Sequence, residues 1–468
     1  MKKIILALAA VSFLAACESQ LDPKFELPKP ESSFGAFSES ALINKINPEA
    51  SSSNLSADGT YTFVAKLGHP AKEDGTITLA KSDLQKLVKD YNDFKGVFDY
   101  VLFPETHYEF VEGTFKKGDN SGEVQVKLKE YESLEQGDYI LPLIVNMDGK
   151  KMMHPVFIRK DADYVAISET NKKPMPSGDY NCPNRKEPMK MVAYVETNDW
   201  DIRNMGQFIL KESKKPVFDI VILFAANMNY DAKAGRRVLH FNDKLQPIVN
   251  DPEKYIKPLT YRGIKVLIDI LPNHQGVGYY NFQNYEEALD FARQCKHYTD
   301  KLGIDGWDID EEYARYDVLP EKPEKGNQSL LWFMRAMKEV MPDKLLTLYD
   351  YGHNLRYDSV DETGKKPKDY LDYSWANYSE DHGSFAGIPD ERYGKLSIEA
   401  AQGGLNTYNA KYRAEQNLRD CMGLLMIFNI NGRTIKGGRA ATALSEATKL
   451  FYGEECIFEG KYHNGPKD

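Results

Sequence analysis

The stretch of sequence that decides the fold, residues 304–313, reads IDGWDIDEEY. It places five carboxylates within eight residues, around a tryptophan and an isoleucine. In an extended chain successive side chains point to opposite faces. Asp308, Asp310 and Glu312 therefore share one face, and the tryptophan and isoleucine share the other with Glu311. The stretch predicts a strand with three acids on one face and a core-facing surface on the other.

This stretch is the fourth of eight strand-like runs in the C-terminal part of the chain. The runs cover residues 191–195, 218–224, 265–271, 304–313, 345–349, 373–376, 395–398 and 424–428. Amphipathic helical patterns join several of them, at residues 285–302, 329–340, 411–419 and 440–452. Near-continuous apolar strands that alternate with helices predict an α/β fold, a (β/α)8 TIM barrel. Two connections, 353–370 and 379–394, lack a helical period and are expected to be irregular.

The N-terminal part of the chain has a different pattern of apolar and polar residues. Residues 56–165 contain short alternating runs separated by turn signals, which predict a small β-sandwich domain, interrupted by one helical pattern at 82–91. Residues 18–55 are rich in Ser and Pro and predict a tether and an entry strand. The proline-rich segment 166–188 predicts a linker, so the barrel domain would occupy residues 189–468.

Residues 1–17 resemble a bacterial lipoprotein signal. Two lysines precede a short apolar run, and the sequence LAAC ends at Cys17. The run is too short to span a membrane as a helix. We expect the mature chain to begin at a lipidated Cys17 and to be anchored to the outer membrane, at the cell surface. An ordinary secretory peptide that happens to contain Cys17 is the alternative.

Charge and cysteine spacing exclude several other classes. The formal net charge of -10 argues against a nucleic-acid partner, because binding to phosphates needs a basic surface. Cys182, Cys295, Cys421 and Cys456 match no zinc spacing, and the chain has no HExxH motif. We therefore expect a monomer without a metal or another cofactor, with small buried cysteines and no required disulfide.

The three acids indicate a reaction that uses acid catalysis. Residues at the carboxyl ends of barrel strands form the active site of a TIM barrel, so the acids should converge at its mouth. Neighbouring acids in a partly dry site cannot all ionise cheaply, and at least one pKa should rise. A carboxylic acid kept protonated near neutral pH can protonate the leaving oxygen of a glycoside. A solvated edge strand or a calcium loop is the alternative, although Ile309 and the missing EF-hand glycine argue against calcium.

The pattern DGxDxDxE at residues 305–312 resembles the signature of glycoside hydrolase family 18. The resemblance extends to the Endo H-like endo-β-N-acetylglucosaminidases and covers roughly residues 190–455 in order. The segments that carry it are 193–196, 224–231, 239–242, 263–267, 273–276 and 341–344. The N-terminal layout resembles the small β-sandwich module of Bacteroides-type surface lipoproteins.

The resemblance implies retaining, substrate-assisted hydrolysis of the GlcNAc-β1,4-GlcNAc core of N-glycans on glycoproteins. Glu312 would protonate the glycosidic oxygen while the substrate's own acetamido carbonyl attacks the anomeric carbon. Asp310 would orient the acetamido nitrogen and stabilise its charge, and Asp308 would hold Asp310 and share its proton. Tyr378 would donate a hydrogen bond to the acetamido oxygen.

Other polar and aromatic residues lie at or just beyond the predicted strand ends. The candidates for substrate binding are Tyr194, Glu196, Asn273, His274, Asp350, Trp375 and Asn429. Each of them could instead pack the barrel or brace a loop. Two positions depart from the family pattern: Ala376, with Asn377 beside it, stands where an amide side chain is usual, and Pro272 stands where glycine is common.

Two other functions stay open at this stage. A catalytically silent glycan-binding lipoprotein on the same scaffold would be expected to lose one of the acids, and all three are present. A chitinase-like hydrolase would be expected to carry an additional α+β insertion late in the barrel. The spacing from Tyr378 to Leu424 leaves little room for such an insertion.

Overall fold

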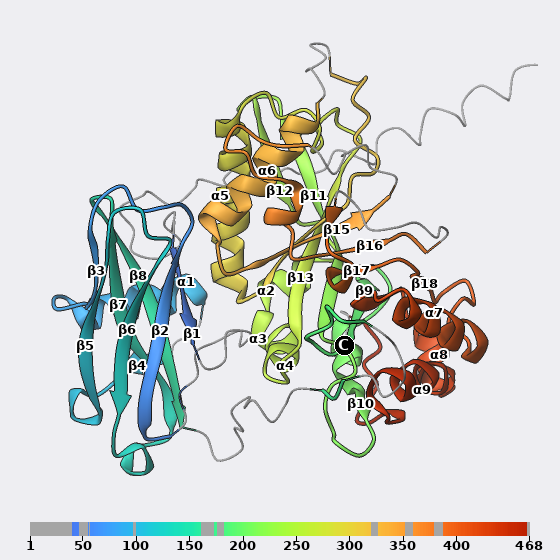
Figure 1. Cartoon of the computed structure of the whole chain (residues 1–468), viewed down its shortest axis with the longest axis horizontal. Helices are drawn as coiled ribbons and strands as arrows, with labels where there is room; N and C mark the ends of the chain where they lie inside the picture. The colour runs from blue at the N-terminus through green and yellow to red at the C-terminus, as the bar shows by residue number, and fades with distance from the viewer. Residues whose placement is uncertain are drawn as a thin grey trace, which may run out of the picture.

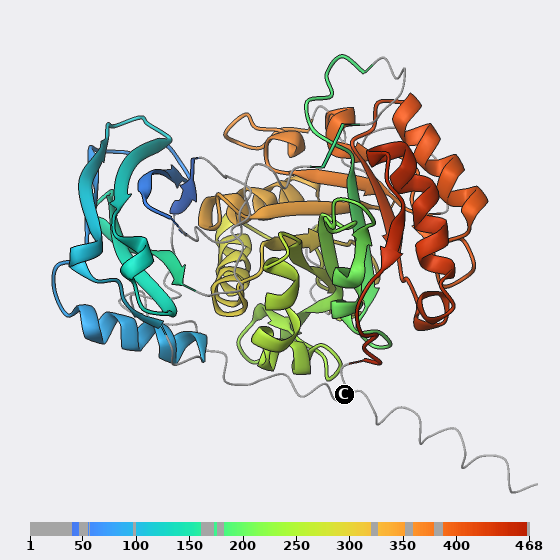
Figure 2. The same ribbon diagram turned by 90° about the horizontal axis from the view of Figure 1, so that it is seen from below.

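The chain folds into an N-terminal β domain and a C-terminal barrel, which lie side by side (Figures 1 and 2). The computed structural model describes residues 40–45, 55, 57–96, 100–160, 173–175, 182–319, 326–351, 359–378 and 387–465. The predicted signal, with Cys17, lies outside these residues. Within them, no helix combines the length and the apolar character needed to cross a membrane.

The N-terminal domain is a mainly antiparallel sheet that wraps around an apolar core. Its strands are β1 (Ser40–Asn44), β2 (Gly59–Leu67), β3 (Gly75–Leu79), β4 (Tyr100–Leu102), β5 (Tyr108–Phe115), β6 (Ser121–Leu128), β7 (Gly137–Met147) and β8 (Lys150–Lys160). They pair in the order β1-β2-β6-β5-β3-β7-β4, with β8 also on β7. Strand β6 shows why this sequence forms a sheet with one buried face, because exposed and buried residues alternate along its whole length.

Two elements of this domain bear on the sequence analysis. Helix α1 (Leu84–Lys95) lies where the helical pattern at 82–91 predicted one. Strand β1 pairs antiparallel with β2 and lies inside the segment 18–55, which was predicted to contain an entry strand.

The barrel domain confirms the predicted (β/α)8 architecture. Its parallel strands are β9 (Lys190–Glu196), β11 (Ile220–Asp231), β13 (Lys265–Pro272), β14 (Gly306–Ile309), β15 (Leu345–Asp350), β16 (Tyr373–Ala376), β17 (Tyr393–Gly394), β18 (Ile398–Glu399) and β19 (Leu424–Phe428). They follow this order around the sheet, and β19 pairs with β9 to close it. The seventh strand is split, because β17 pairs with β16 whereas β18 pairs with β19.

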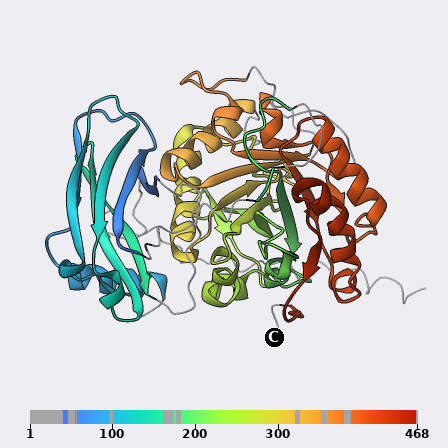
Figure 3. The same ribbon diagram turned by 60° about the horizontal axis from the view of Figure 1, so that its bottom comes forward.

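Helices surround the strands on the outside (Figure 3). They are α2 (Gln246–Asn250), α3 (Pro252–Tyr255), α4 (Lys257–Thr260), α5 (Tyr285–Leu302), α6 (Asn327–Val340), α7 (Thr407–Arg419), α8 (Gly432–Lys436) and α9 (Arg439–Tyr452). Short strands β10 (Phe208–Leu210) and β20 (Cys456–Phe458) pair with each other, and β12 (Arg236–His240) pairs with β11. The described parts of the two irregular connections contain 3-10 turns and no α-helix.

Helix α5 coincides with its predicted range because the sequence marks both ends. The Asn284 side chain accepts a hydrogen bond from the backbone N–H of Glu287, which caps the first turn. Gly303 ends the helix with a φ of 71°, a left-handed conformation that glycine adopts without steric cost.

Two apolar cores result from this arrangement. One fills the barrel interior and includes Val192, Ile222 and Met426. The larger one lies between the strands and the helices and contains Trp307 and Ile309. The predicted two-faced character of the fourth strand is therefore confirmed, since its apolar residues point away from the barrel axis.

The domains meet along α1 and α5. The Lys95 ammonium group at the end of α1 donates a hydrogen bond to the backbone oxygen of Asp300, at 3.0 Å. The Phe94 ring contacts the His297 ring edge-on, with 5.5 Å between centroids. Farther along, the Arg159 guanidinium group lies over the ring of Tyr261 at 4.6 Å. Polar and aromatic contacts thus dominate this interface.

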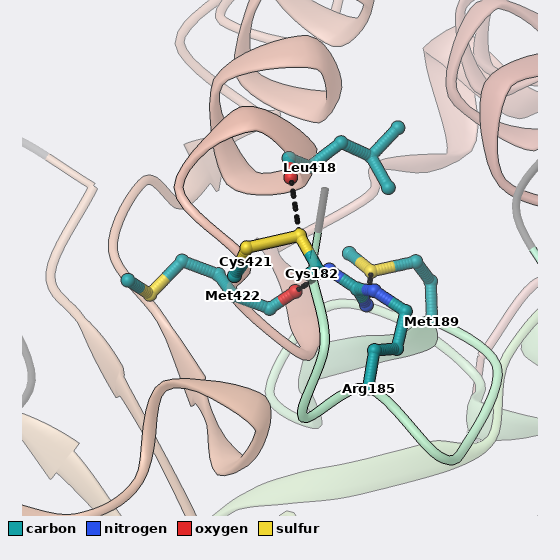
Figure 4. The surroundings of a disulfide bond; sticks show 6 residues. All are labelled: Cys182, Arg185, Met189, Leu418, Cys421 and Met422. Carbon is teal, nitrogen blue, oxygen red and sulfur yellow. Dashed lines mark hydrogen bonds between the residues drawn. A yellow bond between two sulfur atoms is a disulfide. The ribbon is translucent and has the colours of Figure 1, made fainter. Parts of the chain in front are cut away.

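A disulfide joins Cys182, just before the barrel, to Cys421, just after α7 (Figure 4). The expectation that these are small buried residues was wrong for this pair, whereas the expectation that the fold requires no disulfide stays a prediction. The two residues are separated by 239 positions in sequence, but their Cα atoms are 5.3 Å apart, which is within the range that a disulfide requires. Cys295 and Cys456 are free and buried, as expected.

Candidate active site

The centre of the site is a row of polar residues on three adjacent strands. Asp269 on β13, Asp308 on β14 and Thr347 on β15 are direct neighbours in the parallel register. Neighbours in register point to the same face of a sheet, and here all three are completely buried. This face is the barrel interior, opposite the side to which Trp307 points.

Asp308 is held by two hydroxyl groups. The Tyr194 hydroxyl donates a hydrogen bond to Asp308 Oδ2, and the Thr347 hydroxyl donates one to Oδ1. Burial raises the pKa of Asp308 to about 6, although the two hydroxyls oppose this change by stabilising the ionised form. Asp308 is therefore an acid that titrates near neutrality inside the barrel.

Asp310 and Glu312 follow β14 toward the mouth. Asp310 is 3 % exposed, and its Oδ1 atom has no hydrogen-bond partner among the described residues. Burial, and then the negative charges of Glu312 and Asp308, raise the pKa of Asp310 well above its usual range. Glu312 is partly exposed, and burial raises its pKa while a hydrogen bond with Tyr313 lowers it. Both carboxyl groups near the mouth thus have pKa values shifted toward the protonated form.

The two remaining acids of the stretch have structural partners. Glu311 accepts hydrogen bonds from the Tyr279 backbone N–H at 2.8 Å and from the Tyr316 hydroxyl at 2.6 Å. Asp305, at the start of the strand, accepts one from the Val266 backbone N–H at 2.9 Å. Of the five carboxylates, only the three on the inward face are left for chemistry.

Tyr378 lies close to the acids. It follows β16, and its ring stacks on Phe428 with 5.8 Å between centroids. Burial raises the pKa of Tyr378, and the negative charges of Glu399, Glu312 and Asp310 raise it further. The hydroxyl therefore keeps its proton and lies near Glu312 and Asp310.

Two of the candidate binding residues, Trp375 and Tyr194, lie beneath the mouth, inside the barrel, and a third, Asp350, lies on its outer face. Trp375 is completely buried, and its Nε1 donates to the Tyr194 hydroxyl oxygen at 2.9 Å. Tyr194 is 2 % exposed, and its hydroxyl, which accepts the hydrogen bond from Trp375, donates one to Asp308. Asp350 instead lies on the outer face of β15, in register with Ala376, and accepts a hydrogen bond from the Tyr393 hydroxyl at 2.9 Å. The contacts of Trp375 and Tyr194 make these two residues supports for Asp308, whereas Asp350 has no part in holding the acids.

The other candidates lie at the rim. Glu196 accepts a hydrogen bond from Asn198, and burial raises its pKa. Asn273 donates one to Asn229 Oδ1 at 2.9 Å, which braces the loop after β13.

His274 and Asn429 both have positive φ angles, of 56° and 60°. The His274 ring lies 5.4 Å from the ring of Tyr313, and its side chain is exposed. Asn429 has a buried Oδ1 without a hydrogen-bond partner among the described residues.

The two departures from the family pattern are now located. Ala376 is completely buried and points into the core between strands and helices, so it cannot contact a substrate. Asn377 is 2 % exposed. Pro272 is the last residue of β13 and lies in register with Met228 of β11.

The sequence analysis missed several residues of the site. Asp269 was visible as the lone charge in an otherwise apolar run, but its importance depends on its register with Asp308. Tyr349 and Tyr351 stack at the end of β15, with 6.1 Å between centroids, and the Tyr351 side chain is exposed. Among the described residues, no group of three or more His, Cys, Asp or Glu side chains could hold a metal ion.

A (β/α)8 barrel with a split seventh strand and with the DGxDxDxE acids at the end of its fourth strand defines a family 18 glycoside hydrolase. The chain is 31% identical over 287 residues to an endo-β-N-acetylglucosaminidase of Flavobacterium sp. (strain SK1022), which covers 60% of this chain and 87% of that protein. It is 30% identical over 284 residues to endo-β-N-acetylglucosaminidase F1 of Elizabethkingia meningoseptica, with 58% and 81% coverage. The chain belongs to the endo-β-N-acetylglucosaminidase family.

The whole two-domain chain is similar to a solved structure. EndoBT-3987 of Bacteroides thetaiotaomicron, crystallised with a Man5GlcNAc product, matches with a TM-score of 0.56 at 24% identity, over 91% of this chain and 98% of that one. The same protein with a Man9GlcNAc2Asn substrate matches with a TM-score of 0.54. A family model described as an N-terminal domain matches residues 37–151.

Proposed function

We propose that this endo-β-N-acetylglucosaminidase cleaves the GlcNAc-β1,4-GlcNAc core of N-glycans on glycoproteins, with retention and with help from the substrate's acetamido group. The observation that carries the proposal is the placement of Asp308, Asp310 and Glu312 on one inward face, with Tyr378 close to Asp310 and Glu312. The relatives are named for this cleavage, and EndoBT-3987 has been crystallised with Man9GlcNAc2Asn.

The geometry supports one division of labour. Glu312, the most exposed of the three acids, protonates the leaving oxygen as the acetamido oxygen attacks the anomeric carbon. Asp310 accepts the acetamido N–H and stabilises the positive charge that develops on the ring formed by this attack. Asp308 takes up the proton of Asp310, and the Tyr378 hydroxyl donates to the acetamido oxygen. No enzyme nucleophile is needed, in contrast to the two-carboxylate scheme.

Aromatic rings at the mouth support a sugar ligand. Tyr313 is 57% exposed and Tyr351 is 52% exposed, and both flank the acids. Their exposed faces suit contact with the apolar faces of sugar rings. A carbohydrate in this position would extend from the acids over His274, whose ring contacts Tyr313.

The two competing functions have less support. A chitinase-like α+β insertion is not found between Tyr378 and Leu424 in the described residues, where β17, β18, α7 and one 3-10 turn account for the elements. A binding-only protein would not need the raised pKa values at Asp308, Asp310 and Glu312.

The test is product analysis by mass. A high-mannose glycoprotein and a complex-type glycoprotein are each treated with the enzyme, and the released glycan and the trimmed protein are weighed. We expect one GlcNAc to stay on each asparagine. Release of the complete glycan, or cleavage of chitin oligomers but not of glycoproteins, would contradict the proposed substrate.

We also propose that Cys17 carries a lipid anchor that holds the enzyme on the outer membrane, facing the medium. The proposal rests on residues 1–17 of the sequence. It predicts that Cys17→Ser releases the protein from the membrane fraction and that protease added to intact cells degrades the wild-type protein. Protection of the barrel in intact cells would contradict the surface location.

A further inference from the structure

A fourth carboxyl group, outside the DGxDxDxE pattern, lies in the barrel interior. Asp269 is completely buried on β13, in a strand whose other residues between 266 and 271 are apolar. Its Cα partner on the next strand is Asp308, so the two side chains point the same way. The mechanism described above gives Asp269 no part, and a buried charge without a role is costly.

The hydrogen bonds around Asp269 determine where a proton must be. No N–H or hydroxyl group of the described residues donates to either oxygen of Asp269. The carboxyl group beside it in register is that of Asp308, and both groups are completely buried. Two ionised carboxylates side by side in a dry site repel each other and cannot share a hydrogen bond, so one of the two groups carries a proton.

Asp308 is the acceptor of this pair. It already accepts hydrogen bonds from the hydroxyls of Tyr194 and Thr347, one on each oxygen. Those contacts favour its ionised form, whereas Asp269 has no such donor. The proton therefore belongs to Asp269, which donates it to Asp308.

We propose that Asp269 is a positioning residue that stays protonated and donates a hydrogen bond to Asp308, and that this third donor keeps Asp308 ionised. An ionised Asp308 can take up the proton of Asp310, which leaves Asp310 as the carboxylate that faces the acetamido group. A protonated Asp308 cannot take it. This consequence rests on the proposed mechanism, whereas the protonation of Asp269 does not.

The surroundings of Asp269 favour its neutral form. The titratable groups around it are Asp308, Asp310 and Glu312 from the β14 side, Tyr194 on β9, and Tyr279 after β13. Each of these groups is either neutral or negative. Burial, and then the charges of Asp310 and Asp308, raise the pKa of Asp269 well above its usual range. The Tyr279 hydroxyl donates to the Ile270 backbone oxygen at 2.8 Å and so is not available to Asp269.

Two substitutions separate positioning from simple packing. Asp269→Asn keeps a donor to Asp308 but cannot lose a proton, whereas Asp269→Ala removes the donor. A hydrogen bond to the ionised form lowers a pKa, so its loss raises the pKa of Asp308. In Asp269→Ala the acid limb of the kcat profile should move to higher pH by about one unit. In Asp269→Asn the acid limb should stay in place, and any alkaline limb from Asp269 ionisation should disappear.

A measurement without substrate tests the protonation itself. The infrared spectrum of the full-length enzyme at neutral pH should contain a carbonyl band of a protonated carboxylic acid that is missing in Asp269→Asn. The matched control is Asp305→Asn, which removes a buried carboxylate that pairs with Lys265 and should leave that band unchanged.

The outcomes are distinct. Loss of the band together with the shifted acid limb supports the proposal. An unchanged band in Asp269→Asn overturns it even if the enzyme cleaves glycans as expected. Equal acid limbs in wild type and Asp269→Ala, with only a lower kcat, would reduce Asp269 to a packing role. If the alanine variant does not fold, the infrared result with Asp269→Asn still decides.

Discussion

The two domains are both built from strands with alternating side chains, yet their interiors differ. Among the described residues, the buried polar side chains of the N-terminal domain are those of Ser40 and Asn92. The barrel interior instead buries Asp269, Asp308 and Asp310. Burial of acids costs free energy unless they are protonated or hydrogen-bonded. The two interiors therefore differ in that the barrel buries acids near its mouth, and burial raises the pKa values of these acids.

Among substitutions of the acids at the barrel mouth, replacement of the proposed proton donor should have the largest effect. Glu312→Gln keeps the shape of the side chain but removes the proton, so kcat should fall by about 10² to 10⁴-fold, the usual contribution of general acid catalysis. Glycan binding, measured by calorimetry, should survive. Near-normal turnover would remove Glu312 from its role.

A slightly smaller loss is expected for Asp310→Asn. The amide cannot balance the positive charge of the cyclic intermediate, and kcat should fall by roughly 10²-fold or more, as when one stabilising group of a transition state is lost. The variant should still transfer an added sugar oxazoline to a GlcNAc acceptor. Early NMR spectra of the wild-type reaction should show a β product, and an initial α product would contradict the mechanism.

The disulfide predicts a difference in stability between two cysteine variants of the barrel. Cys182→Ser should lower the free energy of unfolding by about 2–4 kcal/mol, since the bridge closes a long loop. Urea unfolding, read from tryptophan fluorescence, measures the change. The control is Cys456→Ser, because Cys456 is buried but has no disulfide partner. An equal loss in the two variants would show that packing at the site matters, rather than the bond.

The buried acids predict a pH effect on stability. Burial raises the pKa of Asp308 from 3.8 to about 6, so the folded chain binds this proton more tightly than the unfolded chain. The stabilisation is complete below the unfolded pKa and is lost as pH rises through about 6, a change on the order of 3 kcal/mol. Unfolding between about pH 4 and about pH 7 should therefore depend less on pH in Asp308→Asn than in wild type. Parallel curves would contradict the assignment.

The smallest effect is expected when the domains are separated. A chain that begins just before Cys182 keeps the disulfide and every catalytic residue, and its kcat on a soluble glycopeptide should match that of the full chain. It loses the contact of Lys95 with Asp300 and that of Arg159 with Tyr261. An insoluble or inactive product would show that the interface is part of the fold of the barrel.

The fold was largely predictable because its signals are local. Alternation placed Trp307 and Ile309 outside the barrel, and Asn284 with Gly303 marked both ends of α5. What could not be predicted depends on residues far apart in sequence. The disulfide joins positions 239 residues apart, and the role of Asp269 follows from its register with Asp308 across two strands.

The site was predictable to the same extent. The motif identified Asp308, Asp310 and Glu312, which the structure brings to one face. It did not show that Tyr194 and Trp375 support Asp308 from below, since both the strand ends and the barrel interior accept aromatic residues. Only the hydrogen bonds distinguish the two locations.

The bridge between Cys182 and Cys421 also determines how the barrel bears mechanical load. A pull from the N-terminal domain travels along the backbone and reaches Cys182 before it reaches β9. There the covalent bond diverts the tension to the end of α7, so β9 is not peeled away from β11 and β19, its neighbours in the sheet. Without the bond, the same pull would act directly on β9 and its pairing with β11 and β19.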